Sequence, residues 1–363
     1  MAPAAGIALD RPAERAADRL APVRLWLWIT VALVLAMIVV GGATRLTGSG
    51  LSITEWRPVT GAIPPLSAAD WLAEFERYRQ IPQYELINKG MTLDDFKFIY
   101  WWEWGHRQLG RFIGVFYLAG FLWFSLRRIV NARTSVLLFG MGLLLGLQGA
   151  IGWIMVASGL QPGMVAVAPV KLTLHLVFAS LFLASLVAMA TAMTPPRATE
   201  FPASAGLRAG AWLLMLLVFM QIKLGGLVAG SRAGLVYNTW PLMDGELIPS
   251  LRALFAGSPL IENFVDNAIL VQFNHRLGAY VLLAAAIWHA LASSRGSAGS
   301  SFVRRARAVA LLTVVQGALG VATLLLAVPL SLGLAHQALA MALLIMAVAH
   351  VTRGGGWRVQ ALT

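Results

Sequence analysis

The chain has 363 residues, of which 58% are hydrophobic and only 12% are charged; this excludes an ordinary soluble domain and indicates an integral membrane protein. The net charge of +12 would suggest nucleic acid only if the basic residues shared an exposed face. The absence of cysteine excludes disulfides, cysteine-ligated zinc, iron–sulfur clusters and thiolate or covalently attached haem.

Apolar runs of about 20 residues predict transmembrane helices. Eight such runs are centred on residues 25–44, 104–126, 136–156, 172–192, 210–230, 269–291, 308–327 and 334–352. An even number of spans places both termini on one side of the membrane. Arginines precede the first span and fill the loops that follow even-numbered spans, so the positive-inside rule predicts cytoplasmic termini. The basic excess is therefore mainly a topology signal, and no nucleic-acid partner is expected.

The first long outward segment, residues 45–100, contains two helix-start signals. Ser67 followed by Asp70 predicts a capped amphipathic helix that lies against the membrane or the bundle. Thr92 with Asp95 predicts a second cap, after which the helical pattern runs into the second span.

An internal repeat relates the two halves of the chain. With an offset of 184, residues 41–61 match residues 225–245 without gaps, and residues 148–152 correspond to residues 316–320. The predicted fold class is therefore an all-α membrane protein whose eight transmembrane helices form two four-helix bundles, related by a pseudo-two-fold axis along the membrane normal. The expected segments are a cytoplasmic N-terminal segment (1–24), an N-terminal bundle (25–193), a linker (194–208), a C-terminal bundle (209–352) and a cytoplasmic tail (353–363).

Four histidines occur near the outward ends of the even-numbered spans, two in each half: His106, His175, His275 and His336. A histidine in a span is costly unless it is paired, liganded or facing a cavity. Two imidazoles directed at one point of a bundle core are typical of bis-histidine haem. A hydrogen-bonded packing histidine is the alternative for any one of them, and zinc or copper would require three or four ligands at one point.

The remaining histidines, His289 and His350, lie at the inward ends of their spans and are interpreted as interfacial residues. Arg107 and Arg276 directly follow the first histidine of each pair. Their guanidinium groups are predicted to bind haem propionates, with a snorkelling interfacial arginine as the alternative.

Glu103 is the one feature that differs clearly between the halves. The corresponding residues before His275 are uncharged: Val271, Gln272 and Phe273. A partly buried carboxylate beside one haem site can take up a proton or stabilise positive charge on a substrate. The alternative is a helix-end carboxylate paired with Arg107 or Arg111.

Four motifs together resemble the haem A synthase family. They are residues 41–52 continuing to Glu55-Trp56-Arg57-Pro58, the run Glu103-Trp104-Gly105-His106-Arg107, residues 237–243, and the run Phe273-Asn274-His275-Arg276. The lack of cysteine and the long first outward segment resemble the mitochondrial-type and cysteine-lacking bacterial branch of that family.

The resemblance implies an oxidoreductase that oxidises a porphyrin methyl group of haem O to a formyl group, giving haem A for cytochrome oxidase. It implies catalytic roles for Glu103, His106 and His175, with the substrate haem between the two histidines. His275 and His336 would then hold the iron of a permanent haem b cofactor, with Arg276 and Arg107 as further cofactor-binding residues.

The resemblance also implies the bacterial inner membrane, with the haem sites near the periplasmic side. Because free haem O is hydrophobic and reactive, a complex with haem O synthase is a reasonable expectation; a homo-oligomer is compatible with the sequence, and the electron partner stays open. Two other functions stay open as well: a di-haem b electron carrier linked to quinol, and a transporter whose histidines relay protons.

Overall fold

The computed structural model describes residues 19–195, 203–296 and 298–355. Within these residues the regular structure is helical, apart from one isolated bridge between Met243 and Glu246. Eight helices are long and apolar enough to cross a membrane, which confirms the predicted class and the eight spans. They are α2 (Ala21–Leu46), α5 (Leu93–Leu126), α6 (Ala132–Gly159), α7 (Pro169–Ala192), α8 (Ala205–Gly230), α11 (Ala268–Arg295), α12 (Ser300–Leu325) and α13 (Leu330–Gly354).

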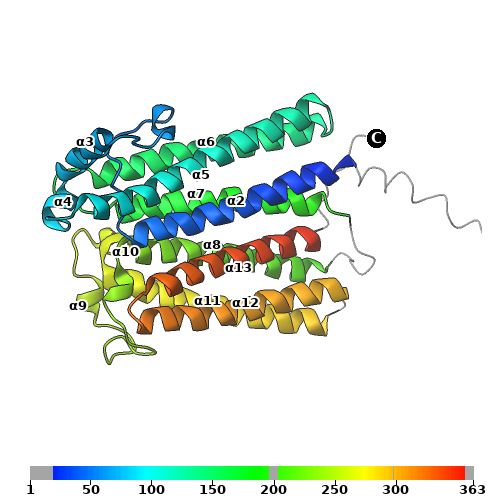
Figure 1. The fold of residues 1–363 in the computed structure, drawn as a ribbon. Helices are drawn as coiled ribbons and strands as arrows, with labels where there is room; N and C mark the ends of the chain where they lie inside the picture. Colours follow the sequence, from blue (N-terminus) through cyan, green and yellow to red (C-terminus); the bar gives the residue numbers. More distant parts are fainter. Residues whose placement is uncertain (1–18, 196–202, 297, 356–363) are drawn as a thin grey trace, which may run out of the picture.

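Shorter helices lie in the segments between spans: α3 (Ala68–Arg79), α4 (Pro82–Leu86), α9 (Leu251–Leu254) and α10 (Asn263–Asp266), with 3-10 turns at Thr60–Ala62, Ala233–Leu235 and Leu260–Glu262. They gather at one end of the molecule, whereas α2 begins and α13 ends at the opposite end (Figure 1). The two predicted capping boxes are present, with Ser67 at the start of α3 and Thr92 at the start of α5. Each hydroxyl accepts an N–H that has no partner within the helix.

The spans form two rings of four. In the first half α2 contacts α5, α5 contacts α6, α6 contacts α7, and α7 contacts α2. The same order is repeated by α8, α11, α12 and α13. Consequently α5 lies diagonally opposite α7 in the first ring, and α11 lies diagonally opposite α13 in the second.

The two rings meet through α2, α7, α8 and α13 (Figure 1). The contact of α7 with α8 has its counterpart in the contact of α13 with α2, and α7 also contacts α13. Exchanging the halves leaves this set of contacts unchanged, as a pseudo-two-fold relation requires, and so supports that interpretation.

The main apolar core lies where the rings meet. Its fully buried members include Phe182, Leu183 and Leu186 on α7 and Leu344 on α13. The outer helices instead expose large apolar side chains, for example Val115 on α5. Apolar side chains need no cover where lipid is the solvent, so this pattern fits a membrane-embedded pair of bundles.

The first outward segment packs on the bundle. Phe75 and Tyr78 of α3 and Tyr84 of α4 join Phe96 of α5 in a buried aromatic cluster, with the rings of Phe75 and Phe96 5.0 Å apart. Burial raises the pKa of the Tyr78 phenol, which donates to Gln83 and accepts from Asn88. Of the two positions predicted for the amphipathic helix, the structure therefore shows the one against the bundle.

The segment limits predicted from the sequence are close to the helix ends. α8 begins at Ala205, inside the stretch 194–208 assigned to the linker. Most of the N-terminal segment, the middle of the linker and most of the C-terminal tail lie outside the described residues.

Candidate functional site

The four outward histidines occupy matching places in the two rings. His106 and His175 lie on the diagonal helices α5 and α7, and His275 and His336 lie on the diagonal helices α11 and α13. His175, His275 and His336 lie six or seven residues after the first residue of their helices. Helix α5 begins farther outward, so His106 lies deeper within its helix. The structure thus brings together both pairs that the sequence predicts.

Each of these imidazoles packs against a glycine of the neighbouring odd-numbered span. A Cβ atom added at the glycine would lie 2.8 to 3.3 Å from the nearest ring atom of the histidine. Any side chain at these positions would displace or crowd the ring, so the glycines shape the space in which the imidazoles lie. The contacts are Gly41 with His106, Gly152 with His175, Gly225 with His275, and Gly320 with His336.

Three of the imidazoles are also held by a glutamine amide. Nε2 of Gln148 lies 3.0 Å from Nδ1 of His175 and donates to the backbone oxygen of the same residue at 2.7 Å. Gln221 makes this pair of contacts with His275, and Gln316 makes it with His336.

The side-chain oxygens of these three glutamines are buried and have no partner among the described residues. A metal-bound imidazole normally donates its second ring N–H to such an acceptor. In this structure the amide nitrogen, which can only donate, lies beside Nδ1, so a group bound through Nε2 would require the amide to turn its free oxygen to Nδ1–H. The internal repeat includes Gln148 and Gln316, but the sequence alone assigned no role to them. Each lies four residues before the glycine that packs on a histidine, and this spacing is the signal that could have identified them.

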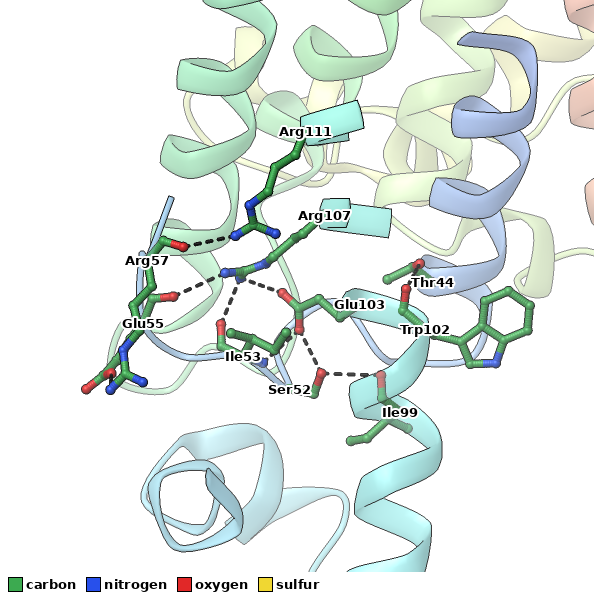
Figure 2. A network of polar contacts seen from close by, with 10 residues as sticks. All are labelled: Thr44, Ser52, Ile53, Glu55, Arg57, Ile99, Trp102, Glu103, Arg107 and Arg111. Carbon is green, nitrogen blue, oxygen red and sulfur yellow. Dashed lines mark hydrogen bonds and ion pairs between the residues drawn. The ribbon is translucent and has the colours of Figure 1, made fainter. Parts of the chain in front are cut away.

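Glu103 is 3% exposed and is fixed by three donors (Figure 2). Arg107 pairs with it at 2.7 Å, and the Ser52 hydroxyl and the Ile53 amide each donate at 2.8 Å. The ion pair with Arg107 is the one that the alternative interpretation predicted. The carboxylate is one helical turn from His106 and joins α5 to the loop that follows α2.

The second half has a neutral version of this network. Gln272 is 2% exposed, and its side-chain oxygen accepts from Arg276 at 2.9 Å. Arg276 also donates to the backbone oxygen of Tyr237, as Arg107 donates to Ile53, its counterpart at the offset of 184. The halves therefore share the arginine clamp, and the negative charge is present in the first half alone.

The two arginines that follow the histidines bind protein in this structure. Arg107 donates to the backbone oxygens of Ile53 and Glu55 (Figure 2), and Arg276 donates to those of Tyr237 and Leu242. Their donors thus fasten the outward loops to the sides of α5 and α11. Direct binding of haem propionates by these side chains stays a prediction.

The interpretation of His289 and His350 as interfacial residues is wrong, because both are 1% exposed. Their Nε2 atoms lie 2.9 Å apart in a hydrogen bond between α11 and α13, and Phe302 packs 4.3 Å from the His350 ring. Each lies 14 residues after an outward histidine of its own helix, which is about 21 Å along the axis. Because the rings bond directly to one another in packed surroundings, this pair is a structural contact inside the second bundle.

The fold and the site define an integral membrane protein with two helical bundles, each holding a pair of opposed histidines and only one holding a carboxylate beside them. Among the described residues, no group of three or more metal-ligating side chains of the His, Asp or Glu type gathers at one point.

Comparison with known proteins agrees with this class. The chain belongs to the family described as Cytochrome oxidase assembly protein, whose model matches residues 24–348. It is 60% identical over 334 residues to a protein of Methylorubrum extorquens, covering 92% of this chain and 87% of the relative. It is 58% identical to one from Methylobacterium sp. strain 4-46, covering 96% and 95%, and 50% identical to one from Bradyrhizobium sp. strain ORS 278, covering 94% of each. All three relatives are named Heme A synthase.

Proposed function

We propose that this protein is a haem A synthase, which oxidises one porphyrin methyl group of haem O to the formyl group of haem A. The observation that carries the proposal is the opposed histidine pair in each of two matching bundles, with a buried carboxylate beside one pair only. The name that its relatives carry at 50–60% identity over most of the chain supports it.

Haem fits these sites better than a single metal ion does. The two imidazoles on diagonal helices would together hold a haem iron, whereas zinc would need further ligands at the same point. Glutamine amides lie beside three of the rings, and their oxygens are buried without a partner among the described residues; turned toward Nδ1, such an oxygen would accept the N–H of an iron-bound imidazole.

The two bundles divide the work. The N-terminal bundle, residues 25–193, takes the substrate haem O between His106 and His175. The C-terminal bundle, residues 209–352, keeps a haem b between His275 and His336. When bound, haem b supplies one-electron redox chemistry that links the substrate site to an external electron partner. The carboxylate assigns the roles, because of the two clamps beside the histidine pairs only the one with Glu103 carries a negative charge.

Glu103 is the catalytic carboxylate in this proposal. Oxidation of a methyl group makes its carbon electron-poor, and a fixed negative charge nearby stabilises that carbon. The hydrogen bonds from Arg107, Ser52 and Ile53 hold the carboxylate in one orientation, so no reorganisation is needed during reaction. Gln272 forms a comparable clamp without charge, which indicates that the clamp alone does not require a carboxylate.

Arg107 and Arg276 position the loops that cover the outward ends of the two bundles. Arg276 also keeps one buried donor, Nε, that has no partner among the described residues. A haem propionate that reached this atom would complete its hydrogen bonding.

The distribution of arginines supports cytoplasmic termini and haem pairs near the periplasmic face of the bacterial inner membrane. Haem O is apolar and reactive, so direct transfer from haem O synthase within a complex would avoid its release into the lipid.

The test is to co-express the chain with a haem O synthase in cells that lack haem A, and to separate the extracted haems by chromatography. Haem A is expected with the wild-type chain and is expected to disappear in His106→Ala. His275→Ala and His336→Ala are expected to remove the resident low-spin haem from the purified protein. Haem b in both halves with no conversion of haem O would instead favour the di-haem electron carrier, and a colourless protein would defeat both haem functions.

A further inference from the structure

One residue of each odd-numbered span, four positions before the glycine that packs on a histidine, determines how that histidine is held. In three spans this residue is glutamine: Gln148 before Gly152, Gln221 before Gly225, and Gln316 before Gly320. A spacing of four residues places the amide and the glycine on the same helix face. The amide and the glycine therefore contact the same imidazole.

The fourth span has methionine at this position. Met37 precedes Gly41 by four residues, and its Cε atom lies beside Gly110, one turn beyond His106 on α5. A thioether cannot donate to the backbone oxygen of the histidine as the three glutamines do, and it accepts only weakly from a ring N–H. As a result, no glutamine among the described residues is hydrogen-bonded to the His106 ring, in contrast to the other three imidazoles.

The orientation of the His106 ring differs as well. The three glutamine-held rings turn the edge with Cε1 and Nδ1 toward their glycines, with Cε1 nearest at 2.8 to 3.3 Å from an added Cβ. His106 turns its other edge toward Gly41, with Nε2 nearest at 2.9 Å. In this orientation Nε2, the usual iron-binding nitrogen, faces the backbone of α2.

We propose that Met37 is a positioning residue that leaves His106 as the one loosely held haem ligand, so that the haem between His106 and His175 is exchangeable. This rests on the proposed function, in which both pairs bind haem. An enzyme whose substrate and product are both haems must release one haem and keep the other. The first bundle lacks the glutamine amide at His106 and can therefore release its haem. In the second bundle glutamine amides hold both His275 and His336.

The expected change in the rate of haem loss follows from what a hydrogen bond to a metal-bound histidine contributes to metal affinity. Loss of the hydrogen-bond partner of a metal-ligating histidine typically lowers metal affinity about 10- to 100-fold. Met37→Gln is expected to add the missing amide contact and to slow haem loss from the first bundle by about the same factor.

The experiment uses the purified full-length protein with haem bound, mixed with excess apomyoglobin, which captures released haem and reports it by absorbance. Wild type is expected to lose haem in two phases, and Met37→Gln is expected to slow only the faster one while the spectrum stays low-spin. The matched control Met37→Leu keeps an apolar side chain without an amide, so both phases are expected to match wild type. In the converse variant, Gln221→Met, the slower phase is expected to accelerate.

Identical release from both halves of wild type would overturn the proposal. Unchanged rates of haem loss in both Met37→Gln and Gln221→Met would also overturn it. If Met37→Gln fails to fold, the rate in Gln221→Met decides the question. Unchanged rates in a chain that still makes haem A would overturn the role of Met37 alone, whereas a chain that binds no haem would overturn the proposed function as well.

Discussion

Glu103 and Gln272 occupy equivalent positions in the two halves, and each accepts a hydrogen bond from the arginine four residues later, at 2.7 and 2.9 Å. The clamp between helix and loop is therefore common to both bundles. The two clamps differ in charge, because Glu103 is a carboxylate and Gln272 is an amide. A substitution can therefore remove the charge and keep the hydrogen bond to the arginine.

Glu103→Gln is expected to keep the bond to Arg107 and the bound haem while lowering formation of haem A at least about 100-fold, as for loss of one preorganised electrostatic group. Gln272→Glu is the matched control and is expected to leave product formation unchanged. The measurement is the ratio of haem A to haem O in extracts, together with the haem content of the purified protein. Full activity in Glu103→Gln would show that the carboxylate is structural.

Glu103→Ala removes the clamp as well as the charge. Breaking a buried ion pair by deleting one partner costs about 3–5 kcal/mol, and Arg107 is only 16% exposed in its side chain. We therefore expect Glu103→Ala to lose product formation and also to unfold at a lower temperature than Glu103→Gln. Equal thermal stability of the two variants would contradict the clamp.

The glycines that pack on the histidines can be tested against neighbours in the same helices. A Cβ at Gly320 would lie 2.8 Å from Cε1 of His336, whereas a Cβ at Gly317 would meet no atom within 4 Å. Gly320→Ala is expected to displace the imidazole and to remove most of the low-spin haem of the second bundle. Gly317→Ala is expected to keep it, with stability unchanged or raised by about 0.5–1 kcal/mol. Equal haem content in both variants would show that the close contact does not position His336.

The buried contact between His289 and His350 predicts a non-additive double variant. His289→Phe leaves the buried imidazole of His350 without its partner, which is expected to cost about 1–3 kcal/mol. Replacing both histidines by apolar residues, as in His289→Phe with His350→Leu, is expected to restore most of this loss. Thermal unfolding of the four proteins of the cycle measures the coupling. A double variant as unstable as the sum of the single ones would argue against it.

The capping box at Ser67 predicts how α3 responds to acid. The hydrogen bond from the Ser67 side chain is the main cause that holds the pKa of Asp70 below its ordinary value of 3.8. A lowered folded-state pKa means that the contribution of Asp70 to stability is complete above the ordinary pKa and is lost as the pH falls through the folded value. Hydrogen-exchange protection of α3 is therefore expected to weaken as the pH falls below the ordinary pKa of an aspartate. Asp70→Asn is the control and is expected to show less of this acid-dependent loss; equal loss in both proteins would assign it to other groups.

Much of this protein follows from its sequence because the signals are local. An apolar run in lipid must satisfy its backbone hydrogen bonds within a helix. The apolar runs were therefore enough to predict the eight spans. Ser67 and Thr92 marked two helix starts, since capping depends on residues three positions apart. The repeat also placed the four outward histidines in matching pairs, and the difference between Glu103 and Gln272 was visible once the halves were aligned.

The tertiary structure decided what depends on contacts between distant helices. His289 and His350 are 61 residues apart in the chain, and only the ring that sets α11 diagonally opposite α13 makes them partners. In the same way, the arginines that were predicted to bind propionates donate to loops, and the glutamines gain their role from the imidazoles of neighbouring spans. A sequence pattern shows which side chains share a helix face, but which side chain meets that face depends on the order and rotation of the helices in each ring.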